Sequence, residues 1–290
     1  DLNHLPLWRC LMTTQEDIIT FKHYLQINHK PKTIESYNLL LNKFEVIFAQ
    51  KPLEEITSDE IFNFLENLTH NLSKSTRRLR YAQLKAFYNF IIERRSLNMR
   101  NPCNMPLLSK SFKAPKNTPH KILERETVDE MIYNTKRQRD RLMLELQARC
   151  GLRIGELLKI KASDIAERTI TLREPKSGKD SEKAYMPENV SRKLEEYIKE
   201  KAIPGDARVF PICYSTARSI VRGLGAKLNI HVAPHDLRRY SATYASRNGV
   251  PLEVVSKVIL RHQDLKTTQI YLGKVSDNEA IRWMDILHGK

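Results

Sequence analysis

The sequence predicts a two-domain, mainly α-helical protein with one small β hairpin in its C-terminal half. Three observations lead to this prediction. The chain has 290 residues, enough for about two domains of roughly 150 residues each. Apolar residues recur at three- and four-residue steps along most of the chain, as on the buried face of a helix. A segment rich in proline and lysine, residues 98–120, interrupts these patterns.

We therefore expect a helical domain over residues 12–112, a basic linker over 113–120 and a C-terminal domain over 121–290. The 98–120 segment as a whole is expected to be extended rather than helical, because it contains four prolines.

Four helical patterns fill the N-terminal domain, over residues 14–28, 33–50, 58–69 and 75–95. Capping boxes are predicted at Thr13 and Thr57, because each is followed three residues later by a Glu that can bond back to the backbone. The residues expected to face the core in the last pattern include Leu79 and Ala82. This domain is predicted to be a small helical bundle.

The last helix of the bundle carries a concentration of positive charge. The candidate DNA-contacting residues are Lys74, Arg77, Arg78 and Lys85, with Lys113 and Lys116 in the linker. Tyr81 and Tyr88 lie among them, and cations interleaved with aromatic side chains can follow a DNA backbone. A solvated basic face explains this helix equally well. The connector is likewise either a cationic strap that closes around a duplex or an ordinary linker.

The C-terminal domain is expected to be helical around a short β section. Its predicted helices cover residues 124–135, 138–150, 153–160, 188–202, 214–228, 235–248, 251–260 and 276–287. The predicted hairpin pairs residues 169–173 with 183–186 through a turn at 176–179, and a third strand is expected near Val209.

The charge balance favours nucleic acid as the partner. Lys plus Arg total 49 against 34 Asp plus Glu, a formal net charge of +15, and clustered cations release counterions when they bind phosphates. No apolar run is long enough to span a bilayer. The four cysteines are widely spaced, which argues against a zinc site or a disulfide framework and suits the cytoplasm. A Gly-rich phosphate loop and a His-Glu-x-x-His motif are both missing, which disfavours an NTPase or a zinc hydrolase.

Four separated stretches of the C-terminal domain carry side chains suited to phosphate chemistry. In the first, Arg153 begins a helix after Gly151, where its guanidinium and free helix N–H groups can bind phosphoryl oxygens together. Glu156 lies one turn later, within reach of Arg153. In the second, Lys176 lies at the hairpin turn, from which a flexible side chain can donate a proton to a leaving oxygen.

The third and fourth stretches add two histidines and a tyrosine. His235 and Arg238 are three residues apart, so that one helical face presents both a proton-exchanging group and an anion-binding group. His262 precedes Tyr271 by nine residues. Each residue alone also has a structural explanation: a surface ion pair for Arg153, a solvated turn for Lys176 and a core aromatic for Tyr271.

In this order and spacing, the four stretches resemble the catalytic domain of the tyrosine recombinase/phage integrase family, particularly the Xer-type site-specific recombinases. The resemblance is carried by the Gly-Leu-Arg-Ile-x-Glu-Leu run around Arg153, the hairpin lysine, the His-x-Leu-Arg run at 235–238, His262 and Tyr271. It covers residues 121–290, whereas for 12–112 it rests only on a helical bundle in the expected position.

Two residues depart from the family pattern. Arg261 stands where the family usually has Gly, and Arg239 where many members have a second His.

The resemblance implies a helical bundle joined to a mixed α+β catalytic domain, and a DNA strand transfer that needs neither metal, cofactor nor ATP. Tyr271 would attack the scissile phosphodiester and form a 3′-phosphotyrosine with release of a 5′-hydroxyl. Arg153 and Arg238 would neutralise the non-bridging oxygens, and His262 would donate a further hydrogen bond. His235 would take the tyrosine proton.

Two roles implied by the resemblance remain open between alternatives. Lys176 would protonate the leaving 5′-oxygen, with Lys179 and Lys183 on the same hairpin as alternatives. Glu156 would orient the side of the site that carries Arg153 or the side that carries His235.

The implied partners are double-stranded DNA with a specific recombination site and further copies of the chain, in a tetramer on paired sites. The helix at 276–287 would pack on a neighbouring protomer or on its own domain. The implied role is chromosome-dimer resolution or element integration and excision. The alternatives are a type IB topoisomerase-like enzyme and a non-catalytic DNA-binding protein derived from an integrase. The sequence shows no acidic triad of the kind that would indicate a metal-dependent transposase.

Overall fold

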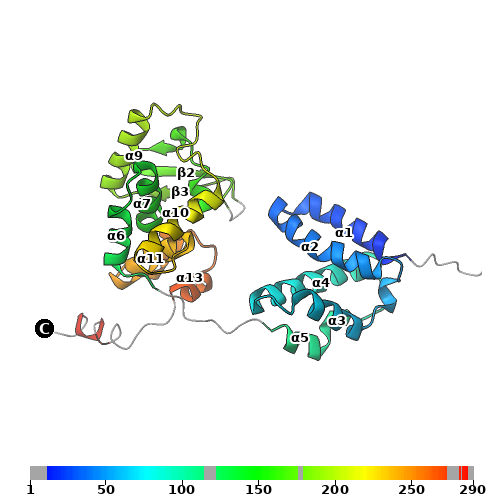
Figure 1. Cartoon of the computed structure of the whole chain (residues 1–290). Helices are drawn as coiled ribbons and strands as arrows, with labels where there is room; N and C mark the ends of the chain where they lie inside the picture. The colour runs from blue at the N-terminus through cyan, green and yellow to red at the C-terminus, as the bar shows by residue number, and fades with distance from the viewer. Residues whose placement is uncertain (1–11, 114–121, 176–178, 273–280, 282, 287–290) are drawn as a thin grey trace, which may run out of the picture. The chain divides into compact units, whose positions relative to one another are not determined.

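The polypeptide forms two compact units, unit 1 over Asp1–Thr118 and unit 2 over Pro119–Lys290 (Figure 1). The structure, a computed structural model, describes residues 12–113, 122–175, 179–272, 281 and 283–286, apart from the side chains of residues 270 and 271. It is mostly helical with one small sheet, which confirms the predicted fold class. Within the described residues, no helix combines the length and the apolar character that crossing a bilayer requires.

Unit 1 is a bundle of helices with short 3-10 turns between them. Its elements are α1 (Thr14–Asn28), α2 (Pro31–Phe48), η1 (Leu53–Glu55), α3 (Ser58–Thr69), α4 (Lys74–Arg94), η2 (Pro102–Asn104) and α5 (Pro106–Ser111). Both predicted capping boxes are confirmed, because the Thr13 and Thr57 side chains accept from the backbone N–H groups of Glu16 and Glu60. A Thr followed three residues later by Glu therefore determined where α1 and α3 begin.

The face of α4 that packs into unit 1 differs from the prediction. Leu79 is 46% exposed and Ala82 is exposed, whereas Tyr81 and Tyr88 are buried together with Leu84. Of the two alternatives for the basic helix, the one in which Tyr81 and Tyr88 take part in following a DNA backbone is therefore excluded for these two side chains. Burying two aromatic rings removes more apolar area from water than burying Leu and Ala would, so this register of the helix is favoured. The hydroxyl of Tyr81 is satisfied by the carbonyl of Cys103 at 2.8 Å.

The expectation of an extended connector is wrong for residues 98–112. The segment folds into η2 and α5, and Cys103, Leu108 and Phe112 are buried in the core of unit 1. Pro102 and Pro106 do not interrupt helices. They stand at the first position of η2 and α5, where the missing N–H costs nothing.

Unit 2 places helices around a small sheet. Its elements are α6 (Arg125–Tyr133), α7 (Gln138–Cys150), α8 (Ile154–Leu157), η3 (Ala162–Asp164), β1 (Ile165–Ala166), β2 (Thr169–Arg173), β3 (Ser181–Tyr185), α9 (Glu188–Glu200), α10 (Tyr214–Lys227), α11 (Pro234–Arg247), α12 (Leu252–Val254), the π-helical turn η4 (Val255–Ile259) and α13 (Leu265–Leu272). The sheet is antiparallel in the order β1-β2-β3, with Leu172 opposite Glu182.

The third strand is not where the sequence predicted it. The third strand of the sheet is β1, which precedes the hairpin in the chain. Next to Val209, the described residues form an isolated bridge between Lys161 and Arg208 instead of a strand. The Val209 N–H donates to the carbonyl of Ile160 at 2.9 Å, so the segment is satisfied by one short contact rather than by a ladder.

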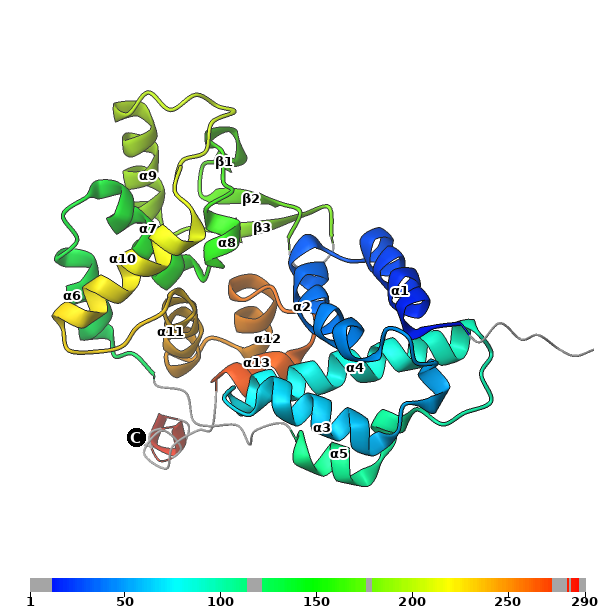
Figure 2. The same cartoon turned by 45° about the vertical axis from the view of Figure 1, so that its right-hand side comes forward.

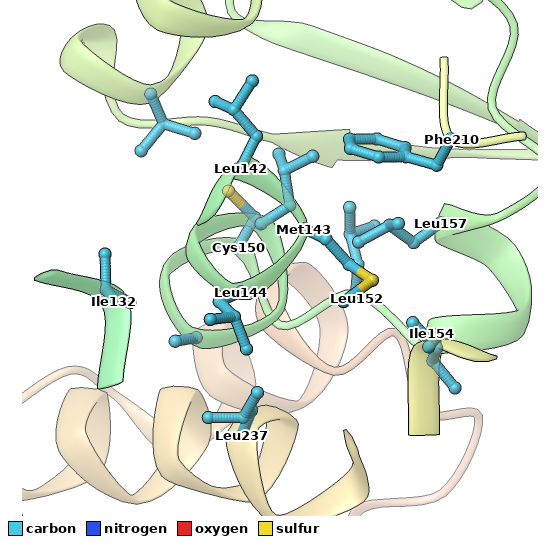
Figure 3. Packing of buried hydrophobic residues seen from close by; sticks show 14 of the residues in the cluster. Ile132, Leu142, Met143, Leu144, Cys150, Leu152, Ile154, Leu157, Phe210 and Leu237 are labelled. Atoms are coloured by element: carbon cyan, nitrogen blue, oxygen red, sulfur yellow. The ribbon is translucent and has the colours of Figure 1, made fainter. Parts of the chain in front are cut away.

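The core of unit 2 surrounds α7. Every residue of α7 from Leu142 to Ala148 is buried, and α7 packs against α6, α9 and α11. Figure 3 shows Leu144 on the side of α7 that faces Leu237 of α11. Because α7 is enclosed on several sides, the position of its C-terminal end at Gly151 is fixed.

The end of unit 2 is more broken than the sequence predicted. Residues 251–260 form α12 and η4 instead of one helix, and α13 follows where no helix was expected. An overlooked signal for α13 is Asp264, whose side chain accepts from the backbone N–H of Lys266 at 2.9 Å. Of the predicted 276–287 helix, residues 281 and 283–286 are helical and the others lie outside the described residues.

Candidate active site

The turn at Gly151 brings the end of α7 against η4. Gly151 has φ +62°, and a Cβ there would lie 2.8 Å from Ile259 Cγ2 and 2.9 Å from the Ile259 carbonyl oxygen. Only glycine combines this left-handed conformation with so close an approach. The Gly151 carbonyl accepts hydrogen bonds from Arg238 on α11 and, at 3.3 Å, from Arg261.

Arg153 and Arg238 converge on one carbonyl oxygen. Leu260 O accepts from Nη2 of Arg238 and, at 3.4 Å, from Nη2 of Arg153. Arg238 is only 1% exposed, whereas Arg153, at the N-terminal end of α8, retains partial exposure. The structure thus brings together two guanidinium groups 85 positions apart in the chain, the arrangement that binding of a phosphodiester requires.

Glu156 holds the arginine cluster together. Its Oε1 accepts from Arg153 Nη1 at 2.6 Å, and its Oε2 lies 3.3 Å from Arg261 Nη2. Burial opposes ionisation of Glu156, but Arg153, Arg261 and Arg238 together hold its pKa below the usual value. The structure therefore connects Glu156 to the arginine side of the site, the first of the two alternatives from the sequence.

His262 is oriented by a buried chain of hydroxyl groups. Its Nδ1 lies 2.9 Å from Thr268 Oγ1, which donates to Ser256 Oγ at 2.9 Å. Thr268 and Ser256 are both fully buried. Because Thr268 belongs to α13, the same contacts fix the helix that carries Tyr271 relative to His262.

Both histidines are held neutral at physiological pH. Partial burial and the positive charges of Arg238 and Arg153 lower the pKa of His262 to about 4. Partial burial and the charges of Arg239 and Arg238 lower the pKa of His235 to about 4. His235 retains solvent exposure as a residue although other groups lie around its ring; it stands in the first turn of α11, where the positive end of the helix also disfavours its protonation. A neutral imidazole is the form that can accept a proton.

A cavity of about 440 Å³ lies beside His262, between β3 and η4. Its lining includes the alternative lysines Lys179 and Lys183, together with Lys257. Lys176 lies outside the described residues, and of Tyr271 only the backbone, in α13, is described. Among the described residues, no group of three or more His, Cys, Asp and Glu side chains could hold a metal ion.

The sequence does not single out Thr268 or Glu182, and it does not indicate the structural role of Arg261. Thr268 and Glu182 give no signal in the sequence, because their contacts with His262 and Arg261 depend on how the chain folds around them. Arg261 does give one, since it stands where the family usually has Gly; its φ of +50° lies in the left-handed region that glycine favours.

The candidate DNA-contacting residues of unit 1 divide into two groups. Lys74, Arg78 and Lys113 are exposed, while Lys85 is half-buried. Arg77 is engaged within the unit, since its Nη2 lies 2.6 Å from Glu66 and its guanidinium lies over the Phe112 ring. Lys116 lies outside the described residues.

Family models match both units of the chain. The model described as phage integrase family matches residues 121–277, and that described as phage integrase, N-terminal SAM-like domain, matches residues 18–95. The chain belongs to the phage integrase family, which confirms the resemblance seen in the sequence.

Individual relatives match over most of the chain. Tyrosine recombinase XerA of Saccharolobus solfataricus is 28% identical over 261 residues, which cover 87% of each chain. Tyrosine recombinase XerC of Haemophilus influenzae is 28% identical and covers 86% of this chain and 89% of its own. This chain is thus similar in sequence to enzymes named tyrosine recombinases.

Solved structures agree with this placement. A crystal structure of XerA recombinase is 26% identical, covers 96% of this chain and 99% of its own, and gives a TM-score of 0.51. A lambda integrase dimer bound to a COC′ core site is 18% identical, covers 92% of this chain and 100% of its own, and gives a TM-score of 0.73. The Tn1549 transposon integrase in complex with transposon right end DNA is 17% identical, covers 95% of this chain and 99% of its own, and gives 0.74. The last two share the fold.

Proposed function

We propose that this protein is a site-specific DNA recombinase that cleaves and rejoins DNA through a 3′-phosphotyrosine. The convergence of Arg153 and Arg238 on the Leu260 carbonyl, next to His262, carries the proposal. It provides two fixed positive charges where a phosphodiester would accumulate negative charge, and His262 becomes a hydrogen-bond donor once the charge of the bound phosphate has raised its pKa and its Nε2 is protonated. No observation favours a type IB topoisomerase or a non-catalytic DNA-binding protein over it.

In the proposed reaction, the phenolic oxygen of Tyr271 attacks phosphorus and the bond from phosphorus to the 5′-oxygen breaks. His235 takes the phenolic proton, which its neutral state in the free protein allows. When the phosphate binds, its negative charge offsets the nearby arginines and raises the pKa of His235, so that proton acceptance becomes more favourable. Arg153, Arg238 and His262 hold the non-bridging oxygens.

A lysine of the hairpin protonates the departing 5′-oxygen. We assign this role to Lys176, while Lys179 and Lys183 line the cavity beside His262 and remain the alternatives. Rejoining is the reverse reaction: a 5′-hydroxyl attacks the phosphotyrosine and releases Tyr271. Because the covalent bond conserves the energy of the phosphodiester, the cycle needs no ATP.

The proposal extends to assembly and DNA contact. Residues 12–112 form the core DNA-binding domain, 113–120 the linker and 121–290 the catalytic domain. Lys74, Arg78, Lys85 and Lys113 contribute phosphate contacts, together with Lys116 and with Arg77 when it leaves Glu66. The chain acts in the cytoplasm as a tetramer on paired sites, and the helix at 276–287 packs on a neighbouring protomer.

A suicide-substrate assay tests this function. The protein is mixed with nicked duplexes of random sequence around the nick, and covalent complexes are isolated on denaturing gels and sequenced, which also identifies the target site. Tyr271→Phe should bind the selected DNA but form no adduct. Tyr244→Phe, the same chemical change in a tyrosine stacked on Tyr240, should react like the unaltered chain. Adducts with Tyr271→Phe at full yield would exclude this nucleophile.

A further inference from the structure

Arg261 is a buried arginine in a costly backbone conformation. Its φ of +50° lies in the left-handed region, which glycine adopts freely and other residues rarely do. Its side chain is only 3% exposed. The contacts that this side chain makes must therefore offset both the backbone strain and the removal of a positive charge from water.

Those contacts join three elements. One guanidinium nitrogen, Nη2, lies 3.3 Å from Glu156 Oε2 and 3.3 Å from the Gly151 carbonyl, while Nη1 donates to the Ile259 carbonyl at 2.9 Å. The third nitrogen, Nε, lies 3.9 Å from Glu182 Oε2 on β3. Arg261 therefore reaches the partner of Arg153 on one side and the hairpin on the other.

The contact with Glu182 is an ion pair without a hydrogen bond. The Glu182 side chain is 9% exposed, and neither Glu182 Oε2 nor Arg261 Nε has a hydrogen-bond partner in the described structure. A separation of 3.9 Å places the two groups in electrostatic contact but leaves room to shorten into a hydrogen bond. Glu182 Oε2 and Arg261 Nε can therefore satisfy each other by forming a hydrogen bond.

Glu182 belongs to the strand that leaves the hairpin turn. β3 contacts η4 directly. In Figure 2 the hairpin is labelled β2 and β3, and η4 continues from the helix labelled α12. A displacement of β3 relative to η4 would move Lys183, which lies on β3, and Lys179 just before it relative to Arg153. The Arg261–Glu182 pair lies at the junction of these two segments.

We infer that Arg261 is a positioning residue that links the hairpin, through Glu182, to the Glu156–Arg153 pair, so that the hairpin lysine and Arg153 act on one phosphate. This inference rests on the proposed function.

Single-turnover cleavage of the selected nicked duplex, with the full chain, tests the inference. Arg261→Gly, Glu182→Gln and the double variant are compared for the cleavage rate at saturating protein and for the Kd of the DNA. Each single variant should cleave about tenfold more slowly, with Kd within about twofold of the unaltered chain, because positioning acts on the chemical step. The double variant should be no slower than Arg261→Gly alone. Glu174→Gln, the same change on a side chain that is 86% exposed, is the control and should cleave normally.

The outcomes separate this inference from the function on which it rests. If the unaltered chain reacts and both single variants cleave at its rate, or if their effects add in the double variant, the inference is overturned. A loss that appears only in Kd also overturns it. If Arg261→Gly does not fold, Glu182→Gln, which leaves the Arg261–Glu156 contact intact, decides alone. If the unaltered chain forms no adduct, the proposed function fails and the inference fails with it.

Discussion

Substitution of Gly151 by alanine should destabilise unit 2 strongly, because two costs coincide at this residue. The left-handed φ of +62° costs a residue with a Cβ about 1–2 kcal/mol. The new Cβ would lie 2.8 Å from Ile259 Cγ2 and 2.9 Å from a carbonyl oxygen, and overpacking of this kind costs about 1–3 kcal/mol. The lower entropy of the unfolded alanine chain returns about 0.4–1 kcal/mol. We expect a net loss of about 1–5 kcal/mol in the free energy of unfolding.

Gly155 provides a matched control four residues away. It lies in α8 at an ordinary φ, and no heavy atom is within 4 Å of the position that a Cβ would take. Gly155→Ala should therefore leave the free energy of unfolding unchanged or raise it by up to about 1 kcal/mol, since it sits in the first turn of a short helix and meets no obstacle. Urea unfolding followed by circular dichroism measures both variants, with separate transitions fitted for the two units. Equal midpoints for Gly151→Ala and the unaltered chain would refute the packing described here for η4.

Three further predictions concern single side chains. Thr268→Val should slow cleavage about 10- to 100-fold with little change in DNA affinity, because it removes the contact that orients His262; a normal single-turnover rate would contradict this role. In NMR titrations of the free protein, neither His235 nor His262 should titrate between pH 5.5 and 8, since both have pKa values near 4; a midpoint near 6.5 would contradict it. Because the unfolded chain binds these protons near pH 6.5, their contribution to stability is full above that pH and is lost as the pH falls toward 4. Exposed Cys213, whose pKa is lowered to about 6 by hydrogen bonds from neighbouring hydroxyl groups, should react with iodoacetamide at pH 7 while the buried cysteines remain unmodified in peptide mass spectra.

Local patterns predicted the parts of the fold that depend on neighbouring residues. The capping boxes at Thr13 and Thr57 and the helices that they begin are confirmed, because their signals lie within one helical turn. The buried face of α4 was mistaken, because Leu79 and Tyr81 both fit a helical period and only the surrounding bundle decides between them. The prolines of residues 98–112 led to the wrong prediction of an extended segment for a related reason: proline is also favoured at the first position of a helix.

The sequence named candidate site residues but gave no indication of the contacts that hold them. The order of Arg153, Arg238 and His262 along the chain indicated the chemistry through the family resemblance. No sequence pattern indicated that the Leu260 carbonyl joins the two arginines. Contacts of this kind depend on how α7, α11 and η4 pack, and packing is decided by the whole core of unit 2 rather than by any segment.

In the proposed reaction, fixed guanidinium groups neutralise the phosphodiester that a tyrosine attacks. Arg153→Ala and the unaltered chain are compared on the selected DNA with either a phosphate or an uncharged methylphosphonate at the cleavage position. Arg153→Ala should lose cleavage of the phosphate by at least about 100-fold and recover most of it on the methylphosphonate, where no charge needs neutralisation. An equal defect on both substrates would contradict it.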